Sequence, residues 1–411
     1  MKKFSKALSA ILVASMAVSG LAGCGESTGS TSSATDGAAT TEAEGSAAGS
    51  SSAEGVAGET FYIGGIGPTT GAAAVYGTNV EEGAQIAVDE INAAGGINGY
   101  QIAYRFEDDQ HDAEKSVNAY NSLKDWGMQV LMGTVTTAPC LAVVSETAAD
   151  GMFEITPSAS STDVIKGDNV FQVCFTDPNQ GTASADYISE NKLATKVAII
   201  YDSSDVYSSG IESNFVEEAA NVGIDVVEEL AFTADTNTDF STQLQKAQSA
   251  GAELVFLPIY YTEASKILQQ ADAMGFTPQF FGCDGLDGIL SVEGFDTALA
   301  EDVMLLTPFA ADADDDLTKS FVSSFEAAYN ATPSQFAADA YDAIYIIKAA
   351  LEEAGCTPDM SVEEIGAAMT SAMTSITVDG LTGTGMTWDA SGAVSKSPKA
   401  VKIKDGAYTA M

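Results

Sequence analysis

Five polar side chains of this 411-residue chain stand just beyond short apolar runs that are expected to form strands. They are Thr136, Thr137, Ser158, Ser160 and Asp284. Hydroxyls and a carboxylate can hydrogen-bond the polar ends of a small molecule. Open parallel sheets bind ligands beyond the carboxyl ends of their strands, so the pattern predicts a binding site formed by these side chains.

Metal or thiol chemistry has little support in the sequence. The cysteines beyond Cys24 are scattered without a CxxC pair, and His111 is the one imidazole. We therefore expect no metal site. We expect Cys140, Cys174, Cys283 and Cys356 to be buried free thiols, with one or two disulfides as the alternative.

Alternating apolar runs and amphipathic stretches predict strands and helices in turn from Phe61 onward. The expected strands are 61–67, 100–107, 129–133, 152–156, 196–201, 224–232, 253–258 and 279–282. The expected helices are 79–94, about 113–126, 138–149, 179–190, 209–222, 241–250 and 262–274. Such alternation is typical of parallel sheets covered by helices, and it restarts near Asn179. We therefore predict an α/β fold with two doubly wound lobes and a ligand cleft between them.

The first residues have the pattern of an export signal. Lys2, Lys3 and Lys6 precede an apolar stretch over 7–22, and small residues lead into Cys24. Residues 1–23 are therefore predicted to be a signal peptide, because the run is too short and too polar for a convincing membrane span. LAGC also resembles the bacterial lipobox, which would make Cys24 the lipidated N-terminus, with an ordinary cleaved signal as the alternative. Residues 24–59, rich in Ser, Thr, Ala, Gly and Glu, are expected to form a disordered tether spanning roughly 30–35 Å.

The charge balance argues against polyanionic partners. The chain has 17 Lys+Arg against 58 Asp+Glu, a formal net charge of −41. Such a chain repels nucleic acid and anionic headgroups. We expect no nucleic-acid partner.

Several stretches resemble the leucine/isoleucine/valine-binding proteins of ABC transporters. They are IGGIGPTTGAAAVYGTNVEEGAQIAVDEINAAGGINGYQI, LMGTVTTAPC, EITPSASSTDV, AIIYDSSDVYSSG, LVFLPIYYTEA, FFGCDGL and MTWDASGAVSKSPKAVKIKDGAY, which occur in the family's order. The resemblance implies a type I periplasmic-binding fold whose lobes, joined by three crossovers, close on an amino acid by a hinge. It implies an N-terminal lobe of 60–176 and 308–380, and a C-terminal lobe of 177–307 and 381–411. It further implies a lipid-anchored Gram-positive lipoprotein that serves an ABC permease, is a monomer and has no cofactor.

The resemblance also assigns roles to individual residues. The Thr137 hydroxyl and N–H would bind the ligand's carboxylate, which suits a residue able to cap the helix that follows it. Ser160 would supply a second hydroxyl and Ser158 a backbone carbonyl for the ammonium. Asp284, where the family usually has Glu, would pair with the ammonium. Aromatic residues expected to line the cleft are Tyr76, in a glycine-flanked loop, Tyr207 and Tyr260.

Three other functions fit parts of the sequence. A receptor for urea or short amides would share the fold and the lipobox, but would need no partner for an ammonium. A sensory module would report the ligand without a permease. A secreted hydrolase is disfavoured because there is no G-x-S-x-G motif, and His111 is predicted on a loop outside the cleft. We therefore expect no catalytic residues.

Overall fold

The computed structural model describes residues 58–411, so the predictions for the signal peptide, Cys24 and nearly all of the tether lie outside the described residues. The strands are β1 (Thr60–Gly67), β2 (Gln101–Asp108), β3 (Val130–Gly133), β4 (Phe153–Thr156), β5 (Val170–Gln172), β6 (Lys196–Asp202), β7 (Asp225–Phe232), β8 (Leu254–Leu257), β9 (Gln279–Gly282), β10 (Met304–Thr307), β11 (Lys399–Lys404) and β12 (Ala407–Ala410). The α-helices are α1 (Ala74–Ala93), α2 (Ala113–Trp126), α3 (Thr137–Asp150), α4 (Asp177–Glu190), α5 (Val206–Val222), α6 (Ser241–Ala250), α7 (Tyr261–Ala273), α8 (Asp316–Tyr329), α9 (Gln335–Glu353) and α10 (Val362–Met373).

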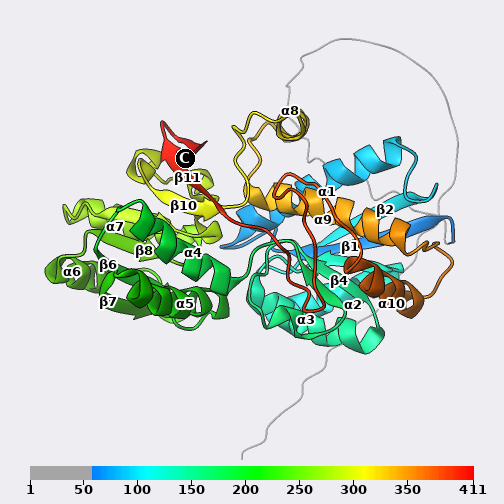
Figure 1. Ribbon diagram of the computed structural model, residues 1–411, viewed down its shortest axis with the longest axis horizontal. Coiled ribbons are helices and arrows are strands. Elements are labelled where there is room, and N and C mark those ends of the chain that lie inside the picture. The colour runs from blue at the N-terminus through cyan, green and yellow to red at the C-terminus, as the bar shows by residue number, and fades with distance from the viewer. Residues whose placement is uncertain (1–57) are drawn as a thin grey trace, which may run out of the picture. The chain divides into compact units, whose positions relative to one another are not determined.

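The strands form two sheets with related topologies, and Figure 1 shows the helices gathered around each. The first sheet has the order β2-β1-β3-β4-β5 and is parallel throughout. The second has the order β12-β11-β10-β9-β8-β6-β7, which repeats the first pattern over β6–β10. The predicted pair of doubly wound lobes is confirmed. The second sheet is nevertheless mixed, because β11 pairs antiparallel with β10 and β12.

Both faces of each sheet are covered by helices, which explains the apolar strand sequences. In β6, Val197 and Ile199 pack in a cluster with residues of α4 and α5, whereas Ala198 and Ile200 pack in a cluster with α6 and α7. All four side chains are fully buried. This two-residue alternation is what a strand between two helical layers requires.

The chain passes between the sheets three times. It leaves the first sheet after β5, returns after β10 to form α8–α10, which contact α1 and the first sheet, and rejoins the second sheet at β11. The stretch before β11, which we assigned to the second lobe from residue 381, makes contacts on the first-lobe side. Asp342 in α9 accepts hydrogen bonds from the backbone N–H groups of Leu381 and Thr382, and Trp388 donates to the carbonyl of Gln172 in β5. These contacts favour a lobe boundary nearer Lys399.

A buried ion pair also holds this stretch against α9. The Lys396 ammonium lies 2.9 Å from Asp339, and both side chains are almost fully buried. Lys396 also donates to the Thr382 hydroxyl, which in turn donates to Asp342. Because every partner is hydrogen-bonded, removing one of them would leave a buried charge unpaired.

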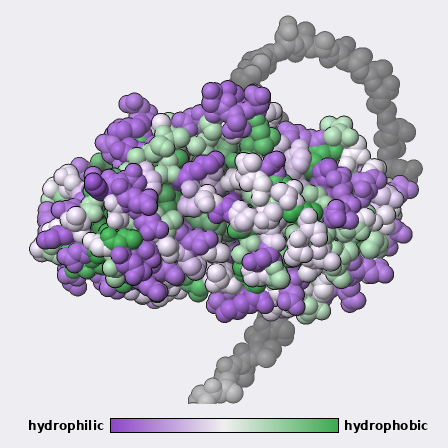
Figure 2. All heavy atoms as spheres, viewed as in Figure 1, coloured by the Kyte–Doolittle hydropathy of each residue, from purple (hydrophilic) through white to green (hydrophobic). Residues whose placement is uncertain are grey.

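No helix among residues 58–411 has the length and apolarity needed to cross a membrane. Figure 2 shows hydrophilic residues over much of the visible face, with hydrophobic residues in small groups. That surface agrees with the strongly acidic composition.

Candidate functional site

The site lies where both sheets change their winding direction. In the first sheet β1 lies between β2 and β3, and in the second β6 lies between β7 and β8. Ligands of doubly wound folds bind at these switch points. Tyr76 and Thr137 follow β1 and β3, and Tyr207 and Tyr260 follow β6 and β8.

One small cavity brings these four residues together. It measures about 10 Å³, roughly the room for one water molecule. Its lining comprises Tyr76, Val135, Thr136, Thr137, Ser158, Tyr207, Tyr260, Asp284, Gly285 and Phe336. The structure therefore brings together six of the seven predicted cleft residues, all except Ser160.

The first-lobe wall consists of hydroxyl groups and the start of α3. Thr136 is the N-cap residue and Thr137 is the first residue of the helix, so the expected capping position of Thr137 is wrong by one residue. The Ser158 hydroxyl donates to the Val135 carbonyl over 2.6 Å. Backbone N–H groups in a first helical turn lack helical acceptors, and therefore suit an anion.

The second-lobe wall presents a buried carboxylate. Tyr207 donates to Asp284 Oδ1 over 2.7 Å, and the Gln180 side-chain amide donates to Oδ2 over 3.0 Å. Burial raises the pKa of Asp284 to about 7, against the lowering effect of the Tyr207 hydrogen bond. Each carboxylate oxygen can accept a further hydrogen bond, so Asp284 is able to receive a cationic group.

Tyr76 joins the two walls. Its hydroxyl donates to the Gly285 carbonyl over 2.6 Å and accepts from the backbone N–H of Tyr261. Its ring packs on Phe336 at 4.3 Å between centroids and on Tyr260 at 5.4 Å. We predicted Tyr76 in a loop, but it lies in the first turn of α1.

Glycines at two positions explain this geometry. A Cβ at Gly77 would lie 2.0 Å from the Pro68 carbonyl oxygen, so α1, which begins at Ala74, can pass this close to Pro68 only with glycine. The sequence prediction began this helix at Asn79, where the regular apolar spacing starts, and the structure begins it at Ala74. A Cβ at Gly285 would lie 2.6 Å from the Tyr207 hydroxyl. Glycine therefore permits Tyr207 to approach both Asp284 and the Gly285 N–H, which donates to its hydroxyl.

Ser160 lies beside the site without lining it. Its side chain is fully buried, and its hydroxyl lies next to the Asp177 carboxyl. Its carbonyl accepts from the backbone N–H of Asp177, whose pKa is raised well above its ordinary value by burial. A ligand role for Ser160 therefore stays a prediction.

Sequence reasoning missed three residues of the site. His111 was expected outside the cleft, but its Nδ1 lies 2.9 Å from the Thr136 hydroxyl and its ring lies 5.5 Å from that of Tyr260. Gln180 and Phe336 come from α4 and α9, far along the chain from the strand ends that gave the other predictions. No local motif marks these residues, because only the tertiary fold brings them to the cleft.

The described part of the chain offers no arrangement suited to metal binding or to thiol chemistry. No group of three or more His, Cys, Asp or Glu residues there is placed to hold a metal ion. The four described cysteines are buried and unpaired. Burial raises the pKa of Cys140, Cys174 and Cys283 well above the ordinary value, so these thiols are poor nucleophiles.

Comparison with known proteins gives consistent matches. Residues 60–407 match the family model described as periplasmic binding protein. Leu/Ile/Val-binding protein homolog 3 of Brucella melitensis is 33% identical over 306 residues, which cover 72% of this chain and 80% of that protein. The crystal structure of LivJ from Streptococcus pneumoniae, in complex with isoleucine, has a TM-score of 0.77 and 29% identity over 85% of this chain and 98% of its own. A solute-binding protein from R. palustris in complex with benzoate shares the fold, with a TM-score of 0.75 and 21% identity over 86% of this chain and 95% of that one.

Proposed function

The chain belongs to the periplasmic binding protein family, and on that premise we propose that it captures an aliphatic amino acid, of the branched-chain type, for an ABC importer. The observation that carries the proposal is the pairing of opposite chemistries around one cavity. Hydroxyls and the start of α3 suit a carboxylate, and the buried Asp284 suits an ammonium. The two ends of a zwitterion match these two walls.

In this proposal the two lobes capture the amino acid by closing on it. An amino acid does not fit into about 10 Å³, so the walls must separate to admit it. The contacts that would open include the hydrogen bond from Tyr76 to Gly285 and the one from the Thr262 hydroxyl to the Ala72 carbonyl. Closure would then bury both charges of the ligand, which is favourable only if each is fully paired.

A thermal-shift screen tests the ligand class. The twenty amino acids, urea, short amides and benzoate are each added to the purified protein. Leucine, isoleucine or valine should give the largest rise in melting temperature, because a ligand that binds only the folded state stabilises it by mass action. A rise with urea, amides or benzoate alone would contradict the proposal.

The proposed receptor is a lipoprotein held at the outer face of the membrane by Cys24, acts as a monomer and catalyses no reaction. The basic start, apolar stretch and LAGC sequence support the anchor. Two or three acyl chains on Cys24 would give durable attachment. Replacing Cys24 with Ser should release the chain into the medium or leave an unprocessed precursor, and membrane retention of a mature-sized chain would count against lipidation.

A further inference from the structure

One hydroxyl of the first-lobe wall is held away from the helix that it could cap. Thr136 is the N-cap residue of α3 and has an extended backbone, with φ −112° and ψ 151°, yet its side chain accepts no hydrogen bond from the helix. Threonine in this position commonly accepts from the N–H of the second or third helical residue. The Thr136 hydroxyl instead lies 2.9 Å from Nδ1 of His111. A residue outside the helix therefore holds the group that would otherwise cap it.

This arrangement leaves the start of α3 open to an anion. Thr137 and Ala138 are the first two residues of the helix, and their N–H groups have no acceptor within it. Pro139, the third residue, has no N–H. A capping Thr136 could therefore accept only from Ala138, and would take one of the two N–H groups that remain for a ligand's carboxylate.

The loop between β2 and α2 fixes the position of His111. The residue has a positive φ of 59°, a conformation in which histidine is more common than most side chains. Its backbone N–H donates over 2.9 Å to Oδ1 of Asp109, which is fully buried. The next residue, Asp112, caps α2 by accepting from two of its N–H groups. His111 and Thr136 both follow strands of the first sheet, so their contact does not depend on closure of the lobes.

The second lobe packs against the same imidazole through Tyr260. The two rings meet edge to face, with 5.5 Å between their centroids and 85° between their planes. Burial lowers the pKa of His111, against the raising effects of Asp112 and Asp202, so the ring is neutral near pH 7. His111 is also not among the residues that line the cavity. It is therefore not placed to bind a carboxylate as a cation.

We propose that His111 is a positioning residue of the cleft, which keeps the Thr136 hydroxyl off the N–H groups of α3 so that a ligand's carboxylate can use them. The inference rests on the proposed function, since it concerns the wall that would receive the amino acid's carboxylate. Thr136 lines the cavity, so His111 acts on the ligand through Thr136. Without the imidazole, the hydroxyl would turn to the Ala138 N–H and leave the carboxylate with one donor fewer.

Calorimetric titration of leucine into two variants of His111 tests this role. His111→Phe keeps a ring against Tyr260 but offers no polar atom to Thr136, so the Kd should rise about tenfold. His111→Asn places an amide atom where Nδ1 was and suits a positive φ, so its Kd should stay within about threefold of the wild-type value. Equal affinity of His111→Phe and the wild type would overturn the proposal, and so would an equal loss in both variants.

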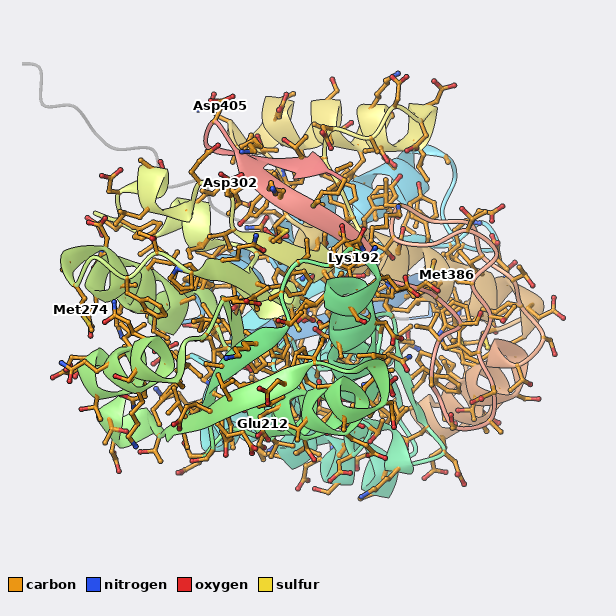
Figure 3. The ribbon with its side chains drawn as sticks, turned by 60° about the vertical axis from the view of Figure 1, so that its left-hand side comes forward. Lys192, Glu212, Met274, Asp302, Met386 and Asp405 are labelled. Atoms are coloured by element: carbon orange, nitrogen blue, oxygen red, sulfur yellow. The ribbon has the colours of Figure 1, made fainter. Side chains whose placement is uncertain are left out.

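Asp405→Phe is the matched control for His111→Phe. Asp405 is exposed at the tip of the β11–β12 hairpin (Figure 3) and has a similar φ of 51°, so the same side chain enters a similar backbone conformation. This variant should bind leucine as the wild type does. A tenfold loss in the control as well would assign the effect of His111→Phe to strain and overturn the proposal.

Replacement of Thr136 separates positioning from a general structural effect. Thr136→Val keeps the shape of the side chain but cannot cap α3, so in that background His111→Phe should change the Kd by less than about twofold. An undiminished loss in that background would overturn the proposal. Failure of the wild-type protein to bind leucine would overturn the proposed function and this inference with it, whereas normal binding by both the wild type and His111→Phe would overturn this inference alone.

A spectroscopic measurement tests the contact itself without any ligand. His111 is the only histidine of the chain, so the nitrogen NMR signals of its ring are assigned without ambiguity. Thr136→Val removes the hydrogen-bond partner of Nδ1 and should shift that signal in the ligand-free protein. An unchanged Nδ1 signal would show that the imidazole does not hold the hydroxyl, and would overturn the proposal.

Discussion

The two walls of the cleft have the same topology and opposite chemistry. The residues of each wall follow the first, third and fourth strands of their lobe, which have the same order: β2-β1-β3-β4 in one lobe and β7-β6-β8-β9 in the other. The first wall offers hydroxyls and the start of α3, and Asp284 on the second wall offers a buried carboxylate. The fold thus fixes where a ligand lies, and a few side chains decide which of its ends faces which lobe.

The two walls also differ in charge. Asp284 places a buried carboxylate on the second wall, whereas the first-wall hydroxyls of Thr136 and Ser158 are neutral and are hydrogen-bonded to His111 and to the Val135 carbonyl. Selection for an amino group should therefore depend mainly on the second wall. The predictions below test that asymmetry.

Removal of the second-wall carboxylate should have the largest effect. Asp284→Ala should weaken leucine binding by about 2–4 kcal/mol, because the ligand's ammonium would be buried without its partner. Titration calorimetry measures the loss. Asp235→Ala, at an exposed position, serves as the control and should bind leucine normally. Near-native affinity in Asp284→Ala would exclude Asp284 as the ammonium partner.

The pH dependence of leucine binding should follow the ionisation of Asp284. Burial raises its pKa to about 7 in the ligand-free protein, and a bound ammonium would lower it. Affinity should therefore rise with pH up to about 7 and then level off, with a loss of at most about 1.4 kcal/mol for each pH unit below that value. Titrations from about pH 5.5 to about pH 8 measure the slope, and Asp284→Asn should flatten it. A slope that persists in Asp284→Asn would assign the titration to another group.

Loss of the Tyr207 hydroxyl, which belongs to the same wall, should have a smaller effect on leucine binding. Tyr207→Phe removes the donor to Asp284 and the acceptor for the Gly285 N–H, and should weaken leucine binding by about 1–2 kcal/mol. Because that hydrogen bond lowers the pKa of Asp284, the pH midpoint should also move upward. An unchanged midpoint would show that Tyr207 acts by packing alone.

Removal of a first-wall hydroxyl should have the smallest effect. Thr137→Val keeps the shape of the side chain and the backbone N–H groups of α3, so leucine binding should weaken by only about 0.5–1.5 kcal/mol. Calorimetry under the conditions used for Asp284→Ala makes the comparison direct. A loss as large as that of Asp284→Ala would mean that the two walls contribute equally.

Much of the fold follows from local sequence patterns. The alternation of strands with amphipathic helices predicted both lobes, since a strand such as β6 buries both faces and has an apolar sequence. The antiparallel β11 and β12 were missed because β11 is rich in lysine and buries only Val401 and Ile403, and β12 is four residues long with no buried residue. The predicted start of α1 at Asn79 was too late, because the close approach of Gly77 to Pro68 depends on how the preceding loop packs, which helix propensity does not record.

The site was predictable only in part. Thr137, Ser158 and Asp284 follow strand ends, so their common location follows from the topology of parallel sheets. The network around Asp284 was not predictable, because Gln180 lies 104 residues away in the sequence. His111 was misplaced for the same reason: its loop follows a strand, but its contacts with Thr136 and Tyr260 depend on how distant elements pack.

A paired titration tests most directly whether the cleft binds a zwitterion by both ends. Leucine and isocaproate, which has the same carbon skeleton and carboxylate but no amino group, are titrated into the same preparation. We expect leucine to bind at one site with a Kd of about 1 μM or tighter, and isocaproate to bind at least about thirtyfold more weakly, because Asp284 would lose its partner. Equal affinity for the two ligands, or binding of isocaproate alone, would contradict the assignment of Asp284 and the proposed amino-acid specificity.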